Sequence, residues 1–144
     1  MEVILKEPEK GAEDRVTVEV KKITPKILKA IAIMRQPDDL TLYQDSKVFK
    51  VATSDVYYIE SVDLKTYIYT SDEVYLSKLT LSGIEKLLEE GDFIRVSKQQ
   101  LVNLQMIENI SPAGAGRFQA LLSNKEVVII SRQFVPKLKE VYGI

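Results

Sequence analysis

Residues 93–103 read Phe93-Ile-Arg-Val-Ser-Lys-Gln-Gln-Leu-Val-Asn103. Two short β-prone runs, Phe93–Val96 and Leu101–Asn103, flank the polar stretch Ser97-Lys98-Gln99-Gln100. Such a pattern predicts two strands joined by a surface turn. The strands would hold Lys98 and its polar neighbours on a short, fixed segment.

The same alternation of β-prone runs and turn residues extends in both directions from this pair. Together these runs predict a mainly β (α+β) fold of antiparallel sheets. The further strands are expected at Leu40–Tyr43, Lys47–Ala52, Val56–Val62, Thr66–Thr70, Glu73–Lys78, Met106–Ile110, Arg117–Leu122 and Glu126–Ile130.

Two helices are expected to pack against these sheets. The first runs from about Thr80 to Glu90, where Ser82 and Glu85 fit a capping box. The second runs from Ser131 to Tyr142. Its Pro136 must lie in the first turn of this helix or begin it, because an interior proline removes a backbone hydrogen bond and clashes with the preceding turn.

The first 42 residues are predicted to form a short extension of strands and a helix that precedes the main domain. Strands are expected at Glu2–Lys6 and Arg15–Val20, and Thr24-Pro25 should begin a helix that stops before Pro37. We therefore divide the chain into residues 1–42 and residues 43–144. The extension is the expected site of self-association, although it could instead complete the core.

Composition excludes most catalytic chemistry. The 144 residues include neither Cys nor His. Disulfides, zinc fingers, thiol nucleophiles and imidazole bases are therefore excluded. We predict no catalytic residues, no metal site and no cofactor. The sequence lacks a run of ~20 apolar residues and the order typical of a signal peptide. A cytoplasmic protein without membrane insertion is expected.

Charge is unevenly distributed along the chain. The total of −1 argues against a nucleic-acid-binding protein, since such domains are usually basic. However, residues 45–92 hold ten acidic and five basic residues, whereas residues 93–144 hold three acidic and seven basic ones. The last segment thus carries +4, which is either a chance asymmetry of a solvated face or part of a positive surface.

Two weaker patterns have ordinary structural explanations. Asp38 and Asp63-Leu64-Lys65 have the residue types of a metal-dependent nuclease, but they do not lie along one buried strand. Five tyrosines between Tyr57 and Tyr75 could stack on single-stranded nucleic acid, but tyrosines in strands usually pack within the sheet.

Several motifs, taken together and in this order, resemble a known family. They are Asp55-Val-Tyr-Tyr-Ile-Glu-Ser61, the segment Phe93–Asn103, Ile107-Glu-Asn-Ile110, Gly116-Arg-Phe118 and Val128-Ile-Ile-Ser-Arg-Gln-Phe-Val-Pro-Lys-Leu138. Residues 43–144 resemble the LytTR-type DNA-binding domain of bacterial transcription regulators. The resemblance implies an elongated β fold that inserts loops, not a recognition helix, into successive major grooves.

The resemblance also implies which residues contact DNA. The base-contacting residues would be Lys65, Thr66, Lys98 and Arg132. The phosphate-contacting or supporting residues would be Arg95, Ser97, Gln99, Ser131 and Gln133. This chain has Ser97 where many relatives carry His, and Gln99 where they carry a small Ser, so the base preference does not transfer.

The implied function is a sequence-specific regulator of transcription that binds double-stranded promoter DNA as a homodimer. Most relatives carry a receiver domain before this module, and 42 residues are too few for one. A stand-alone regulator is therefore expected, controlled by its abundance, by dimerisation or by a regulatory protein partner. The alternative from another class is a protein-interaction module with the same fold.

Overall fold

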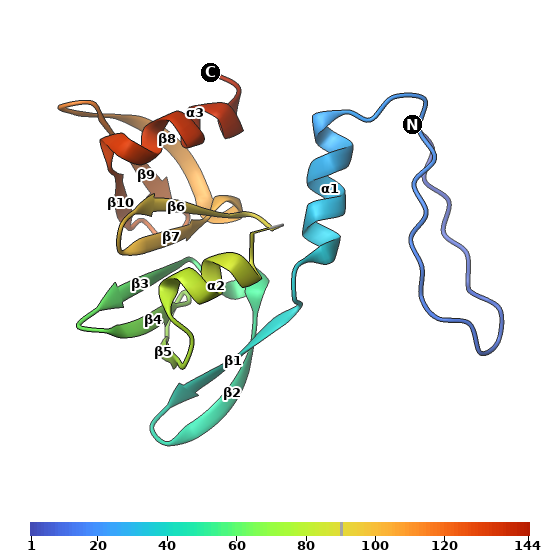
Figure 1. Ribbon diagram of the computed structural model, residues 1–144, viewed down its shortest axis with the longest axis horizontal. Coiled ribbons are helices and arrows are strands. Elements are labelled where there is room, and N and C mark those ends of the chain that lie inside the picture. Colours follow the sequence, from blue (N-terminus) through green and yellow to red (C-terminus); the bar gives the residue numbers. More distant parts are fainter. Residues whose placement is uncertain (90) are drawn as a thin grey trace.

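The computed structural model describes residues 1–89 and 91–144 and contains two antiparallel sheets (Figure 1). The seven-stranded sheet has the order β2 (Lys47–Ala52), β1 (Asp39–Gln44), β5 (Val74–Ser77), β4 (Lys65–Tyr69), β3 (Tyr58–Val62), β7 (Gln100–Asn103) and β6 (Phe93–Ser97). The three-stranded sheet has the order β10 (Val127–Ile130), β9 (Arg117–Leu122) and β8 (Ile107–Gly114). The predicted mainly β fold with packed helices is therefore confirmed.

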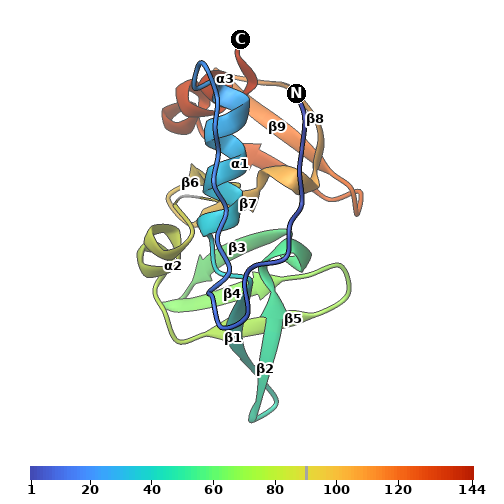
Figure 2. The same cartoon turned by 90° about the vertical axis from the view of Figure 1, so that its right-hand side faces the viewer.

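Two hydrophobic cores meet at the β6–β7 hairpin. The first core lies under α2 (Leu81–Leu87) and contains Leu101 of β7, and the second lies against α3 (Val135–Tyr142) and contains Val102. Because side chains alternate along a strand, β7 contributes to both cores. Figure 2 shows β6 and β7 between the two parts of the domain.

Two-residue turns close the β1–β2 and β3–β4 hairpins. Asp45 and Ser46, and likewise Asp63 and Leu64, all have positive φ, which is the geometry that matches the twist of paired strands. The connection predicted at Asp63-Leu64-Lys65 is thus one residue shorter than expected, and Lys65 is the first residue of β4.

Helix α2 begins differently from the prediction. Thr80 is the N-cap, and its Oγ1 accepts a hydrogen bond of 3.0 Å from the backbone N–H of Gly83. The capping box predicted for Ser82 and Glu85 is therefore wrong, and Glu85 pairs with Arg95 instead. The predicted helix end at Glu90 lies outside the described residues.

The N-terminal helix begins as expected, whereas the C-terminal α-helix begins at Val135 and not at the predicted Ser131. Thr24 caps α1 (Pro25–Arg35), with its Oγ1 accepting from the N–H of Ile27 at 3.3 Å. Pro136 lies in the first turn of α3, which follows a short 3-10 helix, Arg132–Phe134. None of the helices formed by the described residues is long and apolar enough to cross a membrane.

The N-terminal strands predicted at Glu2–Lys6 and Arg15–Val20 are wrong, because residues 1–22 contain no strand. Their backbone is extended, and its one hydrogen bond joins Ala12 N–H to the Glu9 carbonyl. Alternation of apolar residues favours a strand, but a strand forms only beside a partner. The sheet itself begins at Asp39, inside the segment assigned to the extension.

The side chain of Asn103, at the end of β7, makes buried hydrogen bonds to the backbone of neighbouring segments. This residue is 2% exposed; its Nδ2 donates to the Val56 carbonyl at 2.9 Å, and its Oδ1 accepts from the N–H of Gln105 at 3.0 Å. We expect Asn103→Ala to lower the free energy of unfolding by about 1–3 kcal/mol, because it leaves buried backbone groups unpaired. Urea unfolding measures this.

The control for Asn103→Ala is Asn109→Ala, since Asn109 is exposed on β8. Its effect should stay within about 0.5 kcal/mol. Equal effects of the two substitutions would contradict the structural role of Asn103.

Candidate nucleic-acid interface

Three turns that carry predicted DNA-contacting residues lie along one edge of the domain. The β3–β4 turn is joined to the β6–β7 turn by the hydrogen bond from Ser61 N–H to the Gln99 carbonyl, 2.8 Å. The segment after β10 is joined to β6 by the bond from Ser131 N–H to the Val96 carbonyl, 2.9 Å. In Figure 1 these turns all lie on the left side of the molecule.

The β3–β4 hairpin presents Lys65 but not Thr66. Lys65 is exposed, whereas Thr66 is 4% exposed and lies on the same face of β4 as Ile68, which belongs to the first core. Residues two apart along a strand share a face. The base contact predicted for Thr66 is therefore incompatible with its burial in this structure.

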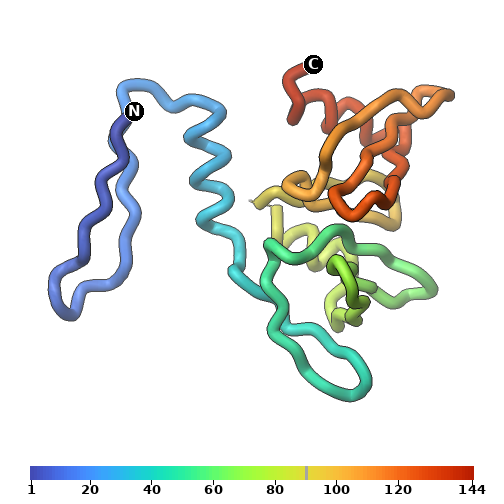
Figure 3. The backbone as a smooth tube through the Cα atoms, turned by 180° about the vertical axis from the view of Figure 1, so that it is seen from behind, coloured from blue at the N-terminus to red at the C-terminus, as the bar shows by residue number. Residues whose placement is uncertain are grey.

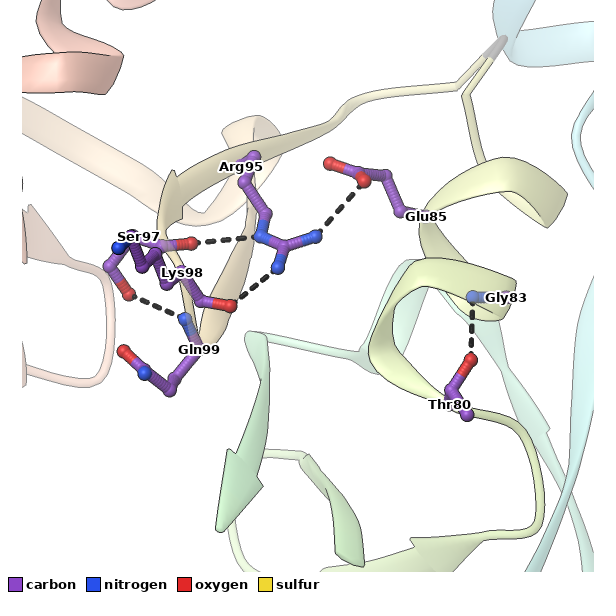
Figure 4. A network of polar contacts seen from close by, with 7 residues as sticks. All are labelled: Thr80, Gly83, Glu85, Arg95, Ser97, Lys98 and Gln99. Carbon is purple, nitrogen blue, oxygen red and sulfur yellow. Dashed lines mark hydrogen bonds and ion pairs between the residues drawn. The ribbon is translucent and has the colours of Figure 1, made fainter. Parts of the chain in front are cut away.

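Arg95 holds the backbone of the β6–β7 turn (Figure 4). Its Nε donates to the Ser97 carbonyl at 2.8 Å, its Nη2 donates to the Lys98 carbonyl, and its Nη1 pairs with Glu85 Oε1 at 3.0 Å. The Arg95 side chain is 20% exposed. Since the guanidinium is engaged within the protein, the structure favours the supporting role predicted for Arg95 over a phosphate contact.

The tip of this turn remains open to solvent. Ser97 Oγ accepts a hydrogen bond of 3.2 Å from the N–H of Gln99, which stabilises the turn locally. The side chains of Lys98 and Gln99 are exposed at the tip. Both can therefore donate hydrogen bonds to an approaching nucleic acid.

Arg132 is placed by contact with a glycine. A Cβ atom at Gly116 would lie 2.8 Å from Cδ and 3.0 Å from Cγ of Arg132, so any other residue at this position would make the Arg132 side chain shift. Gly116 also has φ +76°, a conformation that glycine adopts without strain. Arg132 and Gln133 are exposed, and Ser131 is half-buried.

The site predictions omitted Arg117, which lies on the same edge. It is exposed at the start of β9, next to Gly116, and its Nε donates to the Gly114 carbonyl at 3.3 Å. The signal was present in the Gly116-Arg-Phe118 motif. The turns at this edge thus carry four bases, Lys65, Lys98, Arg117 and Arg132, against one acid, Asp63.

The tyrosines pack within the sheet. Tyr58 and Tyr69, paired across β3 and β4, stack with their ring centroids 4.3 Å apart. Burial, with the nearby carboxylate of Glu126, raises the pKa of the Tyr58 hydroxyl. Burial, with the carboxylate of Glu60, raises that of Tyr69. These rings are engaged with each other and do not form an open stacking platform.

Comparison with known proteins identifies the domain. The family model for the LytTr DNA-binding domain matches residues 46–143. The chain belongs to this family. The predicted family is thus confirmed, and residues 46–143 are a DNA-binding domain of the LytTr type.

A solved structure and curated relatives agree with this assignment. A LytTr DNA-binding domain from Bacillus cereus has a TM-score of 0.71 and 28% identity, covering 75% of this chain and 99% of that one. The sensory transduction protein LytT of Bacillus subtilis is 30% identical over 73% of this chain. An HTH-type transcriptional regulator of Staphylococcus aureus is 28% identical over 79% of this chain and 77% of its own length.

The relatives differ in length from this chain. It spans 41% of Enterococcus faecalis LytT and 44% of Bacillus subtilis LytT. The similarity therefore concerns the LytTr domain and not the remainder of those longer proteins.

The nuclease alternative gains no support from the geometry. Among residues 1–89 and 91–144, no three Asp or Glu side chains are grouped so that they could hold a metal ion. Asp63 and Leu64 form a tight turn between β3 and β4, and Asp38 precedes β1.

Gly116→Ala tests the placement of Arg132. We expect it to weaken binding to a duplex selected by this protein about tenfold, because the new methyl group displaces the Arg132 side chain. Gly114→Ala is the matched control, since Gly114 also has a positive φ but has no atom within 4 Å of a built Cβ. Fluorescence anisotropy measures both affinities, and equal losses would contradict the contact argument.

Glu85→Gln separates support of the turn from phosphate contact by Arg95. If Arg95 holds the turn, losing its ion pair weakens duplex binding, and we expect about threefold. If Arg95 binds phosphate instead, removing a nearby acid strengthens binding or leaves it unchanged.

The control for Glu85→Gln is Glu89→Gln. It removes the same charge near α2 from an exposed residue that makes no ion pair in the described part of the chain. Anisotropy titrations of the unaltered protein and both variants show whether duplex affinity falls or rises. Stronger binding by Glu85→Gln would contradict the supporting role of Arg95.

Proposed function

We propose that this chain is a sequence-specific transcription regulator that binds double-stranded promoter DNA in the cytoplasm. The observation that carries the proposal is the assembly of four bases on the turns of one edge, within a LytTr DNA-binding domain. Their spacing along the chain is irregular, and only the fold brings them together. A net charge of −1 is therefore compatible with a positive binding edge.

The turns supply complementary kinds of contact. Arg132, Lys98 and Lys65 are exposed and long enough to reach base edges, and arginine pairs bidentately with guanine. Ser97, Gln99, Ser131 and Gln133 flank them with polar groups suited to phosphate oxygens. Arg117 adds a fourth base at the β8–β9 turn. We propose that these turns, and not a helix, enter the major groove.

We further propose that two copies bind two half-sites about one helical turn apart. Each copy would then present one edge of turns to the same face of the duplex. The similarity to an HTH-type transcriptional regulator of Staphylococcus aureus supports a role in transcription. Abundance, dimerisation or a regulatory protein partner would set the activity, with no cofactor.

Arg132→Ala is the direct test. It should cost about 1–3 kcal/mol on the cognate duplex and relax the preference at one base position, because one bidentate contact is lost. Selection from a random duplex pool, carried out with both proteins, measures affinity and preference together. An unchanged preference would contradict the assignment of Arg132.

Lys98→Ala provides the comparison. If Lys98 contacts a base, Lys98→Ala should lower affinity and relax the preference at one base position, as expected for Arg132→Ala. If Lys98 contacts a phosphate, binding to all sequences should weaken alike, and the slope of log K against log salt concentration should be lower in magnitude by about 1. If the unaltered protein shows no salt-dependent duplex binding, the protein-interaction module is the correct function. Cleavage of plasmid in the presence of Mg²⁺ would instead support the nuclease.

A further inference from the structure

Residues 1–35 form an arm that lies apart from the two sheets (Figures 1 and 3). The arm consists of the extended residues 1–22 and helix α1, and none of its residues is fully buried. In Figure 1 it lies on the right, on the opposite side of the domain from the edge of turns.

The arm exposes an unusual amount of apolar surface. Of the 23 large hydrophobic residues exposed in the described chain, eleven lie here: Met1, Val3, Ile4, Leu5, Val16, Val18, Val20, Ile23, Leu28, Ile33 and Met34. Taking about 60–120 Å² of apolar surface per fully exposed side chain, and weighting each by its exposed fraction, they offer roughly 400–800 Å². A standard interface buries about 800 Å² per partner, of which a little over half is apolar. The arm alone can therefore supply one side of a stable contact.

The backbone of the arm also lacks partners. Residues 1–9 and 13–22 run antiparallel around Gly11, but no ladder of hydrogen bonds joins them. Val16, Val18 and Val20 alternate with polar residues, as in a strand with one face covered. An extended pair of this kind needs further strands or a helix against it to be stable.

The charges of the arm are complementary to each other. Residues 1–14 hold five acidic and two basic residues, a net charge of −3, whereas residues 15–35 hold one acidic and six basic residues, a net charge of +5. Within the described chain, the acidic side chains of residues 1–14 make no ion pair, and neither do Lys21, Lys22, Lys26 and Lys29.

We propose that the arm binds the arm of a second copy of this chain, with residues 1–14 of one copy against residues 15–35 of the other. A two-fold contact uses the same surface twice, so it requires a surface that complements itself, and an arm with an acidic and a basic half meets this requirement. The contact specifies the interface of the proposed homodimer and in that respect rests on the proposed function. It leaves the edge of turns in each copy free.

The acidic half of the arm distinguishes this contact from DNA binding. The basic residues 15–35 alone would attract phosphate, but the acidic residues beside them would repel it. Another chain with the same arm satisfies both halves at once.

The first experiment compares two valines with nearly equal exposure. Val16 of the arm is 67% exposed and Val48 of β2 is 64% exposed. Sedimentation velocity of the full chain over a micromolar concentration series should show a dimer. Val16→Asp should raise its dissociation constant about tenfold or more, and Val48→Asp should leave it unchanged. A monomeric unaltered chain, or equal effects of the two substitutions, would overturn the proposal.

The second experiment exchanges charges. One variant carries Glu7→Lys and Glu9→Lys, and the other carries Lys21→Glu and Lys22→Glu. Each variant alone should self-associate more weakly, because the first makes residues 1–14 positive (+1 in place of −3) and the second lowers residues 15–35 from +5 to +1. Mixing the two should restore a dimer, now with one copy of each variant. Pairing of charges within one chain, or with a different partner, predicts no restoration, and that result would overturn the proposal.

Self-association is measured without DNA, and base preference is measured separately by selection from a duplex pool. Normal self-association of Arg132→Ala with altered base preference would support both proposals. If the arm variants leave self-association unchanged while Arg132→Ala still alters preference, the arm contact fails and the proposed function stands.

Discussion

Strand β7 is buried on both faces, and the arrangement of the domain depends on it. Leu101 belongs to the first core and Val102 to the second, and both side chains are almost fully covered. A shift of one residue in register would exchange the two faces, but both are apolar. The neighbouring Asn103, with its buried hydrogen bonds, therefore specifies the register. Because the β6–β7 turn continues from this strand, the two cores determine where Lys98 lies.

Individual residues also hold the turns at the edge, by different means. The Arg95 guanidinium donates hydrogen bonds to two backbone carbonyls and pairs with Glu85, so this charged residue stabilises the β6–β7 turn. Gly116 instead contributes the absence of a side chain, which lets the stem of Arg132 lie against the β8–β9 turn. Side chains fixed before binding lose less conformational entropy when DNA arrives. Such preorganisation suits a domain that reads DNA with turns, which are otherwise the mobile parts of a fold.

Local sequence pattern predicted the strands of the domain because each is short, β-prone and bounded by turn residues. It failed where the outcome depends on a partner. Residues 2–6 and 15–20 have the alternation of strands, yet no neighbouring strand pairs with them in the single chain. The base contact expected of Thr66 followed from the resemblance to the LytTR-type family, whereas the strand pattern places Thr66 on the same face as the buried Ile68. The contact between Gly116 and Arg132 joins the β8–β9 turn to the segment that follows β10, and it has no signature in either segment alone.

Net charge averages over surfaces that the fold separates. The turns of one edge carry four bases against one acid, while the arm on the other side of the domain divides into an acidic and a basic half. In the proposed dimer the spacing of the two DNA-binding edges depends on the junction between arm and sheet. That junction is short: residues 36–38 separate α1 from β1, and the Gln36 side chain packs so closely against Gly91 that a Cβ there would overlap it. Gly91 lies two residues before β6, so this contact links the end of the arm to the strand that leads into the turn bearing Lys98. A dimer formed through the arms would then carry a defined distance between half-sites.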